Sequence, residues 1–68
     1  MKLDNRGLEP PQPMMRTLEA LEKLNAGETL QITNDRRPMF LYEQLDELGY
    51  KHVTTPNNDG SFTIEITK

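Results

Sequence analysis

Four arginines are the residues of this 68-residue chain whose types and spacing could recognise an anion. One follows a short apolar segment, one lies near the start of a helical pattern, and two precede a second helical pattern: Arg6, Arg16, Arg36 and Arg37. Arginine binds carboxylate and phosphate groups through paired hydrogen bonds, which lysine cannot do. If the segments before Arg6 and Arg36 are parallel strands, all four arginines and both helix N-termini share one edge of a sheet.

Two of these arginines also have a purely structural explanation. Arg6 and Arg37 could form surface ion pairs with Glu9 and Asp35, and we favour this alternative because such pairs are common and weak. Arg16 in a first helical turn would oppose the helix dipole, at a cost of roughly 0.3–1 kcal/mol. A residue that breaks a local rule is a candidate functional residue.

A proline-rich segment joins the first apolar segment to the first helical pattern. Gly7 permits a backbone turn, Pro10 and Pro11 stiffen the loop, and Pro13 fits the first turn of a helix. The candidate binding site therefore consists of these residues and the arginines with their acidic neighbours: Arg6, Gly7, Glu9, Pro10, Pro11, Pro13, Arg16, Asp35, Arg36 and Arg37.

Catalytic chemistry has little support in the sequence. Only Glu9, Asp35 and His52 could act as acid or base, and no two of them form a recognisable arrangement. His52 is the only histidine and cysteine is absent, so a zinc site lacks ligands and we expect His52 at the surface or in packing. Asp35 is expected to be a helix N-cap or turn residue first. We expect a protein that is not an enzyme and that needs no cofactor or metal.

The hydrophobic pattern predicts the order β-α-β-α-β-β. The predicted strands cover residues 2–6, 28–34, 50–56 and 61–67. One helix begins at Pro13 and ends before a left-handed cap at Gly27, and the other begins near Pro38 and is capped by Gly49. The methionines near the loops are expected to fill the core, whereas exposed ones would indicate an adaptable partner surface: Met14, Met15 and Met39.

These elements predict an α+β two-layer sandwich, with a four-stranded mixed sheet and two helices on one face. A chain of 68 residues favours a single domain over residues 1–68. Residues 1–6 lack the apolar run of a signal peptide, and no segment is apolar enough to span a membrane. Because the absence of cysteine also suits the cytoplasm, we expect a cytoplasmic protein. The net charge of −3 does not favour nucleic-acid binding.

The proline-rich segment and the residues before it also resemble a known family. Leu3-Asp4, Gly7-Leu8 and Pro11-Gln12-Pro13 resemble the TusA-like (SirA-like) sulfur-carrier signature, in which Leu-Asp, two residues and Gly-Leu lead into Cys-Pro-x-Pro. The sulfur-carrying cysteine of that family falls on Pro10, so no persulfide can form there. The chain also resembles a cysteine-less, uncharacterised sister family, whose domain is sometimes appended to haemerythrin-like modules. The residues that carry this second resemblance are Asn34-Asp35, Pro38, Leu41-Tyr42 and Gly49-Tyr50.

The resemblance implies the TusA-like fold without its chemistry. We expect a small non-enzymatic binding module whose site lies on the loops that follow the first and second strands. Its ligand would be an anionic small molecule or an acidic protein segment. The alternative is an accessory protein of redox or sulfur metabolism that acts through a partner, such as a haemerythrin-like protein. RNA binding through the arginines is the least favoured hypothesis.

Overall fold

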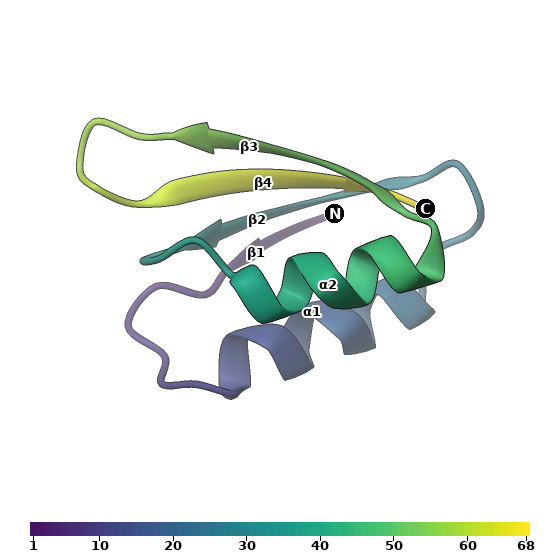
Figure 1. Cartoon of the computed structure of the whole chain (residues 1–68), viewed down its shortest axis with the longest axis horizontal. Coiled ribbons are helices and arrows are strands. Elements are labelled where there is room, and N and C mark those ends of the chain that lie inside the picture. Colours follow the sequence, from purple (N-terminus) through teal and green to yellow (C-terminus); the bar gives the residue numbers. More distant parts are fainter.

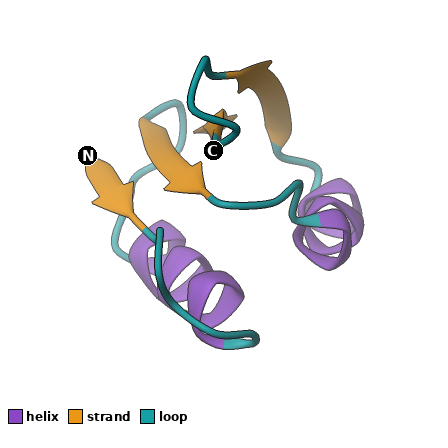
Figure 2. Cartoon of the chain, turned by 90° about the vertical axis from the view of Figure 1, so that its left-hand side faces the viewer, coloured by secondary structure: helices purple, strands orange, loops and turns teal.

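Two helices cover one face of a four-stranded sheet, and no helix covers the other face (Figures 1 and 2). This architecture comes from a computed structural model that describes residues 1–68. The elements in chain order are β1 Lys2–Asp4, α1 Gln12–Glu22, β2 Thr29–Asn34, α2 Met39–Leu48, β3 Lys51–Pro56 and β4 Phe62–Thr67. The predicted α+β sandwich is confirmed. Neither helix is long and apolar enough to cross a membrane.

The strand order in the sheet is β1-β2-β4-β3. β1 and β2 are parallel, whereas β4 runs antiparallel to both β2 and β3. The last strand of the chain therefore lies inside the sheet, with Thr67 opposite Thr29 and Phe62 opposite Asn34. Because β1 and β2 are parallel, the loops that follow them lie at the same end of the molecule (Figure 1).

Alternation in the two central strands creates the core. Leu30 and Ile32 of β2 and Ile64 and Ile66 of β4 are completely buried, while the residues between them face away from the helices. Full burial of such a side chain stabilises the fold by about 1.5–3 kcal/mol. The helices add the other buried apolar residues: Ala20, Leu21, Leu24, Leu41 and Leu45. This packing fixes both helices on the sheet and so positions the loops before them.

The helix ends differ in part from the prediction. Gly49 has a φ of +78° and caps α2, as predicted, because glycine adopts this left-handed conformation without the cost of a Cβ. Gly27 does not cap α1, which ends at Glu22. Lys68 instead donates hydrogen bonds of 2.7 Å from Nζ to the carbonyl oxygens of both Leu21 and Leu24. A distant lysine thus supplies a charged donor to carbonyls at and just after the end of α1.

The methionines near the loops differ in their burial. Met14 packs against the core as predicted, but Met15 and Met39 are 60% and 63% exposed. Phe40 beside Met39 is 77% exposed. The prediction that all three methionines fill the core is therefore wrong, because Met15 lies on the solvent-facing side of α1 and Met39 precedes Leu41, the first buried residue of α2.

Candidate functional site

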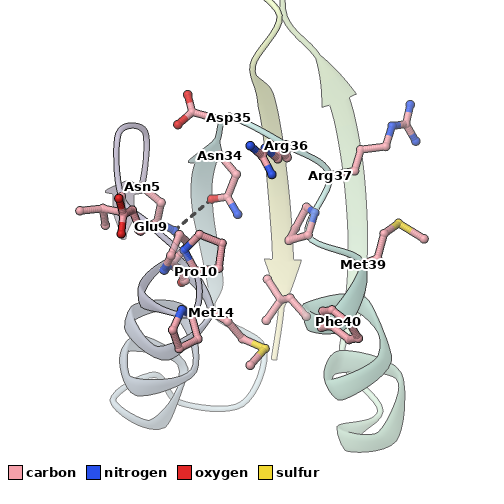
Figure 3. Close-up of a pocket in the computed structure, with 15 residues that line it drawn as sticks. Asn5, Glu9, Pro10, Met14, Asn34, Asp35, Arg36, Arg37, Met39 and Phe40 are labelled. Carbon is pink, nitrogen blue, oxygen red and sulfur yellow. Dashed lines mark hydrogen bonds between the residues drawn. The ribbon is translucent and has the colours of Figure 1, made fainter.

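A groove of about 730 Å³ lies between the β1–α1 loop, residues 5–11, and the β2–α2 loop, residues 35–38 (Figure 3). We call it the loop groove. Its walls come from these two loops and from the first turn of each helix. Cavities of roughly 300–1,000 Å³ are typical of ligand sites.

Three buried polar residues connect the base of the loop groove to α1. Asn5 Nδ2 donates hydrogen bonds to Asn34 Oδ1 at 3.0 Å and to Thr17 Oγ1 at 3.2 Å. Thr17 Oγ1 in turn donates to the carbonyl oxygen of Pro13 at 2.8 Å. The network joins the residue after β1 and the last residue of β2 to the first turns of α1.

One atom of this network has no partner. Asn5 is only 1% exposed and lines the loop groove, yet its Oδ1 accepts no hydrogen bond. A buried polar atom without a partner is rare in native proteins, because desolvation then goes uncompensated. Asn5 thus keeps a buried acceptor without a donor at the base of the groove.

A second hydrogen bond ties the two loops directly to each other. The Gly7 N–H donates to Asp35 Oδ2 at 2.7 Å, and Gly7 has a φ of +79°, which favours glycine. Asp35 was predicted as a helix N-cap or turn residue. It lies in the bend after β2 and is not a cap, because α2 begins only at Met39, after Pro38, and no side chain caps it. The carboxylate of Asp35 therefore holds the opposite loop and not the helix.

Arg6 and Arg16 lie beside β1 and do not line the loop groove. Arg6 contacts both carboxylate oxygens of Asp4, at 2.8 and 2.9 Å, and reaches Asp59 Oδ2 at 3.5 Å. Arg16 donates from Nη1 to the backbone oxygen of Asp4 at 3.1 Å. Hydrogen bonds from the Arg6 side chain and backbone lower the pKa of Asp4 to about 2, and Asp4 raises the pKa of Arg6.

Arg36 and Arg37 line the loop groove but differ in their contacts. The Arg37 guanidinium lies 5.1 Å from the centre of the Phe62 ring, a cation–π distance, and Figure 3 shows it extending away from the β1–α1 loop. The Arg36 guanidinium lies between the two loops in Figure 3 and forms no ion pair. The four arginines therefore do not converge, and one guanidinium without a carboxylate partner faces the groove.

The predicted ion pairs of Arg6 and Arg37 with Glu9 and Asp35 are wrong in their partners. Arg6 pairs with acids of β1 and of the β3–β4 turn, and Arg37 stacks on an aromatic ring. Seven of the predicted site residues do line the loop groove: Glu9, Pro10, Pro11, Pro13, Asp35, Arg36 and Arg37. The other three, Arg6, Gly7 and Arg16, lie beside it.

The sequence analysis missed several lining residues. Asn34 could have been found, because it continues the buried alternation of Leu30 and Ile32 and is itself 5% exposed. A polar side chain at a position that should be apolar is an informative signal. The exposed pair Met39 and Phe40 also lines the groove.

His52 has a structural role, as expected, and is not among the residues that line the loop groove. Its ring stacks on Tyr42 with centroids 4.7 Å apart and an interplanar angle of 8°. Its Nε2 lies 3.0 Å from Asp46 Oδ1. These contacts join α2 to β3, so the only imidazole of the chain belongs to packing on the helix-covered side.

The fold defined by these elements is that of SirA-like proteins. The crystal structure of a SirA-like protein from Desulfitobacterium hafniense matches this chain with a TM-score of 0.88 at 24% sequence identity. The match covers 98% of this chain and 96% of that one.

Within that class, the chain belongs to the family described as "Uncharacterized conserved protein (DUF2249)", whose model matches residues 2–68. A relative from Methanocaldococcus jannaschii named "Putative sulfur carrier protein" is 35% identical over 69 residues, which cover 98% of this chain and 92% of that protein. The predicted kinship with the TusA-like (SirA-like) proteins is confirmed, and this chain contains no cysteine.

Proposed function

We propose that this protein is a small binding module without covalent chemistry of its own, and that the loop groove is its site. The observation that carries the proposal is the unpaired Oδ1 atom of Asn5 at the base of a groove that also holds the unpaired Arg36. Hydrogen bonds from Gly7 to Asp35 and from Asn5 to Asn34 hold the walls of the groove together, so binding would order little additional chain.

Sulfur carriage on a cysteine is not available to this chain. The M. jannaschii relative is named a sulfur carrier, but this sequence has no thiol, and Pro10 stands where the resemblance expects the reactive cysteine. Kinship with that relative supports the alternative in which the module serves sulfur or redox metabolism through a partner protein. Under either hypothesis, the site acts by binding a ligand or a partner protein and not by covalent chemistry.

Acid–base catalysis has no complete set of groups at the loop groove. Of its two carboxylates, Asp35 already accepts a hydrogen bond from Gly7, and no histidine is near Glu9. A general base must reach its substrate proton at hydrogen-bonding distance and be oriented by its neighbours. Glu9 accepts no side-chain hydrogen bond that would orient it, which favours binding over catalysis.

The chemistry of the walls indicates an anionic group attached to an apolar body. Arg36 supplies a planar set of donors suited to a carboxylate or phosphate, whereas prolines, methionines and Phe40 supply apolar contact. A free inorganic anion would contact only the Arg36 donors and would leave the apolar walls unused. We therefore expect an organic carboxylate to bind more tightly than inorganic phosphate.

An NMR titration of the ¹⁵N-labelled protein tests this proposal with sodium benzoate and sodium phosphate as probes. Benzoate should shift the amide signals of Gly7, Arg36 and Met39 and the side-chain amide of Asn34, and phosphate should shift them less. Arg36→Gln should abolish the benzoate shifts, while Arg16→Gln, a matched change outside the loop groove, should not. If neither probe moves the groove amides, the proposal is wrong.

A further inference from the structure

The loop groove is bordered by apolar side chains that a small ligand inside it would leave uncovered. Met39 and Phe40 line the groove but are 63% and 77% exposed, and Met15 on the outer side of α1 is 60% exposed. Methionine, aromatic residues and arginine are the types enriched in the cores of protein interfaces. Methionine also adapts its shape to different partners. These residues indicate an occupant that extends beyond the groove.

The amides at the base of the groove are complementary to a peptide unit. Asn5 Oδ1 lacks a donor, and Asn34 Nδ2 donates to no group of this chain. Figure 3 shows the Asn34 nitrogen on the side of the loop groove, with the oxygen turned to Asn5. A backbone peptide unit offers one N–H and one C=O, which are the groups that this pair lacks.

The charges around the groove are unequal on its two sides. On the β2–α2 side, Asp35 accepts a hydrogen bond from Gly7 and the Arg37 guanidinium lies against Phe62, but both keep their charges. Together with Arg36, which has no such contact, they give this side two cations and one carboxylate, none of them in an ion pair. On the β1–α1 side the charged lining residue is Glu9, which is also in no ion pair. A carboxylate in the groove would be attracted to Arg36 and repelled by Glu9 and Asp35. The more distant acids of the chain are screened beyond about 8 Å at physiological ionic strength.

We infer that the loop groove docks an extended acidic segment of a partner protein, with a carboxylate on Arg36, a backbone unit on Asn5 and Asn34, and apolar side chains against Met39 and Phe40. This inference rests on the proposed function and names the partner chemistry of the same site. The prolines of the walls hold the groove in shape before binding, which reduces the entropy cost of docking an extended chain.

Selection from a phage-displayed library of random linear peptides tests the inference with the full chain as bait. Enriched peptides should carry Asp or Glu next to large apolar residues. For a synthetic peptide of the enriched sequence, Arg36→Gln should weaken binding about tenfold and Glu9→Gln should strengthen it severalfold. Replacing the peptide's acid by its amide should remove both effects, and Arg16→Gln should leave the affinity unchanged.

The two variants of the groove should fold normally, because Arg36 and Glu9 are exposed and their side chains form no hydrogen bond. Three results would overturn the inference: no enrichment of acidic peptides, equal binding by Arg36→Gln, or amide shifts outside the groove. If benzoate still moves the groove amides in any of these cases, the proposed function stands and only the peptide occupant is wrong. If benzoate also has no effect, both fail.

Discussion

Substitution of Asn5 by alanine gives a quantitative test of the buried amide network. The variant loses the hydrogen bonds to Asn34 and Thr17, each worth about 1 kcal/mol, and leaves Asn34 Oδ1 buried without its donor, at a further cost of about 1–3 kcal/mol. Removal of the unpaired Asn5 Oδ1 returns about 1 kcal/mol of that loss. We expect Asn5→Ala to lower the free energy of unfolding by about 2–4 kcal/mol.

This loss is large for a chain of 68 residues, whose total stability is about 3–10 kcal/mol. Urea unfolding followed by far-ultraviolet circular dichroism measures it, with Asn34→Ala and the double variant completing the cycle. Because the double variant leaves no amide oxygen orphaned, its cost should fall short of the sum of the single costs by at least about 1 kcal/mol.

The result that would refute this reasoning is additivity. If the two single costs sum to the double cost within about 0.5 kcal/mol, the amides do not act as a pair. A loss below about 1 kcal/mol for Asn5→Ala would show that water already satisfies these groups in solution. Thr17→Ser, which keeps the hydroxyl, serves as a control and should cost far less than Asn5→Ala.

The Asp4–Arg6 pair, the Lys68 side chain and the exposed position 10 can each be tested by substitution. Asp4 has its pKa lowered from 3.8 to about 2 by Arg6, so the pair stabilises the fold above pH 4, and this stabilisation should be lost as the pH falls through 2. Melting temperatures of the wild type and Asp4→Asn should therefore converge at low pH. Lys68→Ala should lower stability by about 1 kcal/mol in urea unfolding, since the carbonyls of Leu21 and Leu24, at and just after the end of α1, lose a charged donor. Pro10→Cys should react rapidly with Ellman's reagent, because position 10 is exposed just before a helix N-terminus, whereas Leu21→Cys in the core should not.

A specific result would contradict each of these three predictions. A constant difference in melting temperature between wild type and Asp4→Asn from pH 6 to pH 2 would mean that the Asp4–Arg6 pair does not affect folding. Lys68→Arg keeps a cation at the end of α1, so equal stability of Lys68→Ala and Lys68→Arg would exclude the capping role. A Pro10→Cys thiol that reacts as slowly as the Leu21→Cys thiol would contradict the alignment with the sulfur carriers.

The sheet and both helices could be predicted because their signals are local. Alternation at Ile64 and Ile66 identifies one buried face, and the glycine at position 49 fits only a helix end. The end of α1 could not be predicted from nearby residues, since Lys68 comes from the far end of the chain. Local patterns therefore define the elements, whereas distant contacts decide where some of them stop.

The two loops that form the loop groove were predicted from the sequence, but the contacts of their side chains were not. The pairing of Asp4 with Arg6 was readable, because an aspartate side chain in a turn commonly accepts a hydrogen bond from the backbone N–H two residues on. The contact of Arg6 with Asp59 spans 53 positions and depends on how the hairpin is placed. Asn34 was visible as a polar break in a buried alternation, but the unpaired oxygen of Asn5 depends on side-chain geometry that no spacing encodes.

The position of β4 between β2 and β3 has a consequence for the order of events during synthesis. Residues 2–56 contain every helix and the other three strands, yet β3 contacts the sheet only through β4. A nascent chain on the ribosome therefore holds β3 without a strand partner until residues 62–67 have left the exit tunnel. The sheet can close only at that point, because the pairs it needs are far apart in the sequence. A chain interrupted before residue 62 would leave the backbone groups along one edge of β2 unpaired and become a substrate for chaperones or proteases.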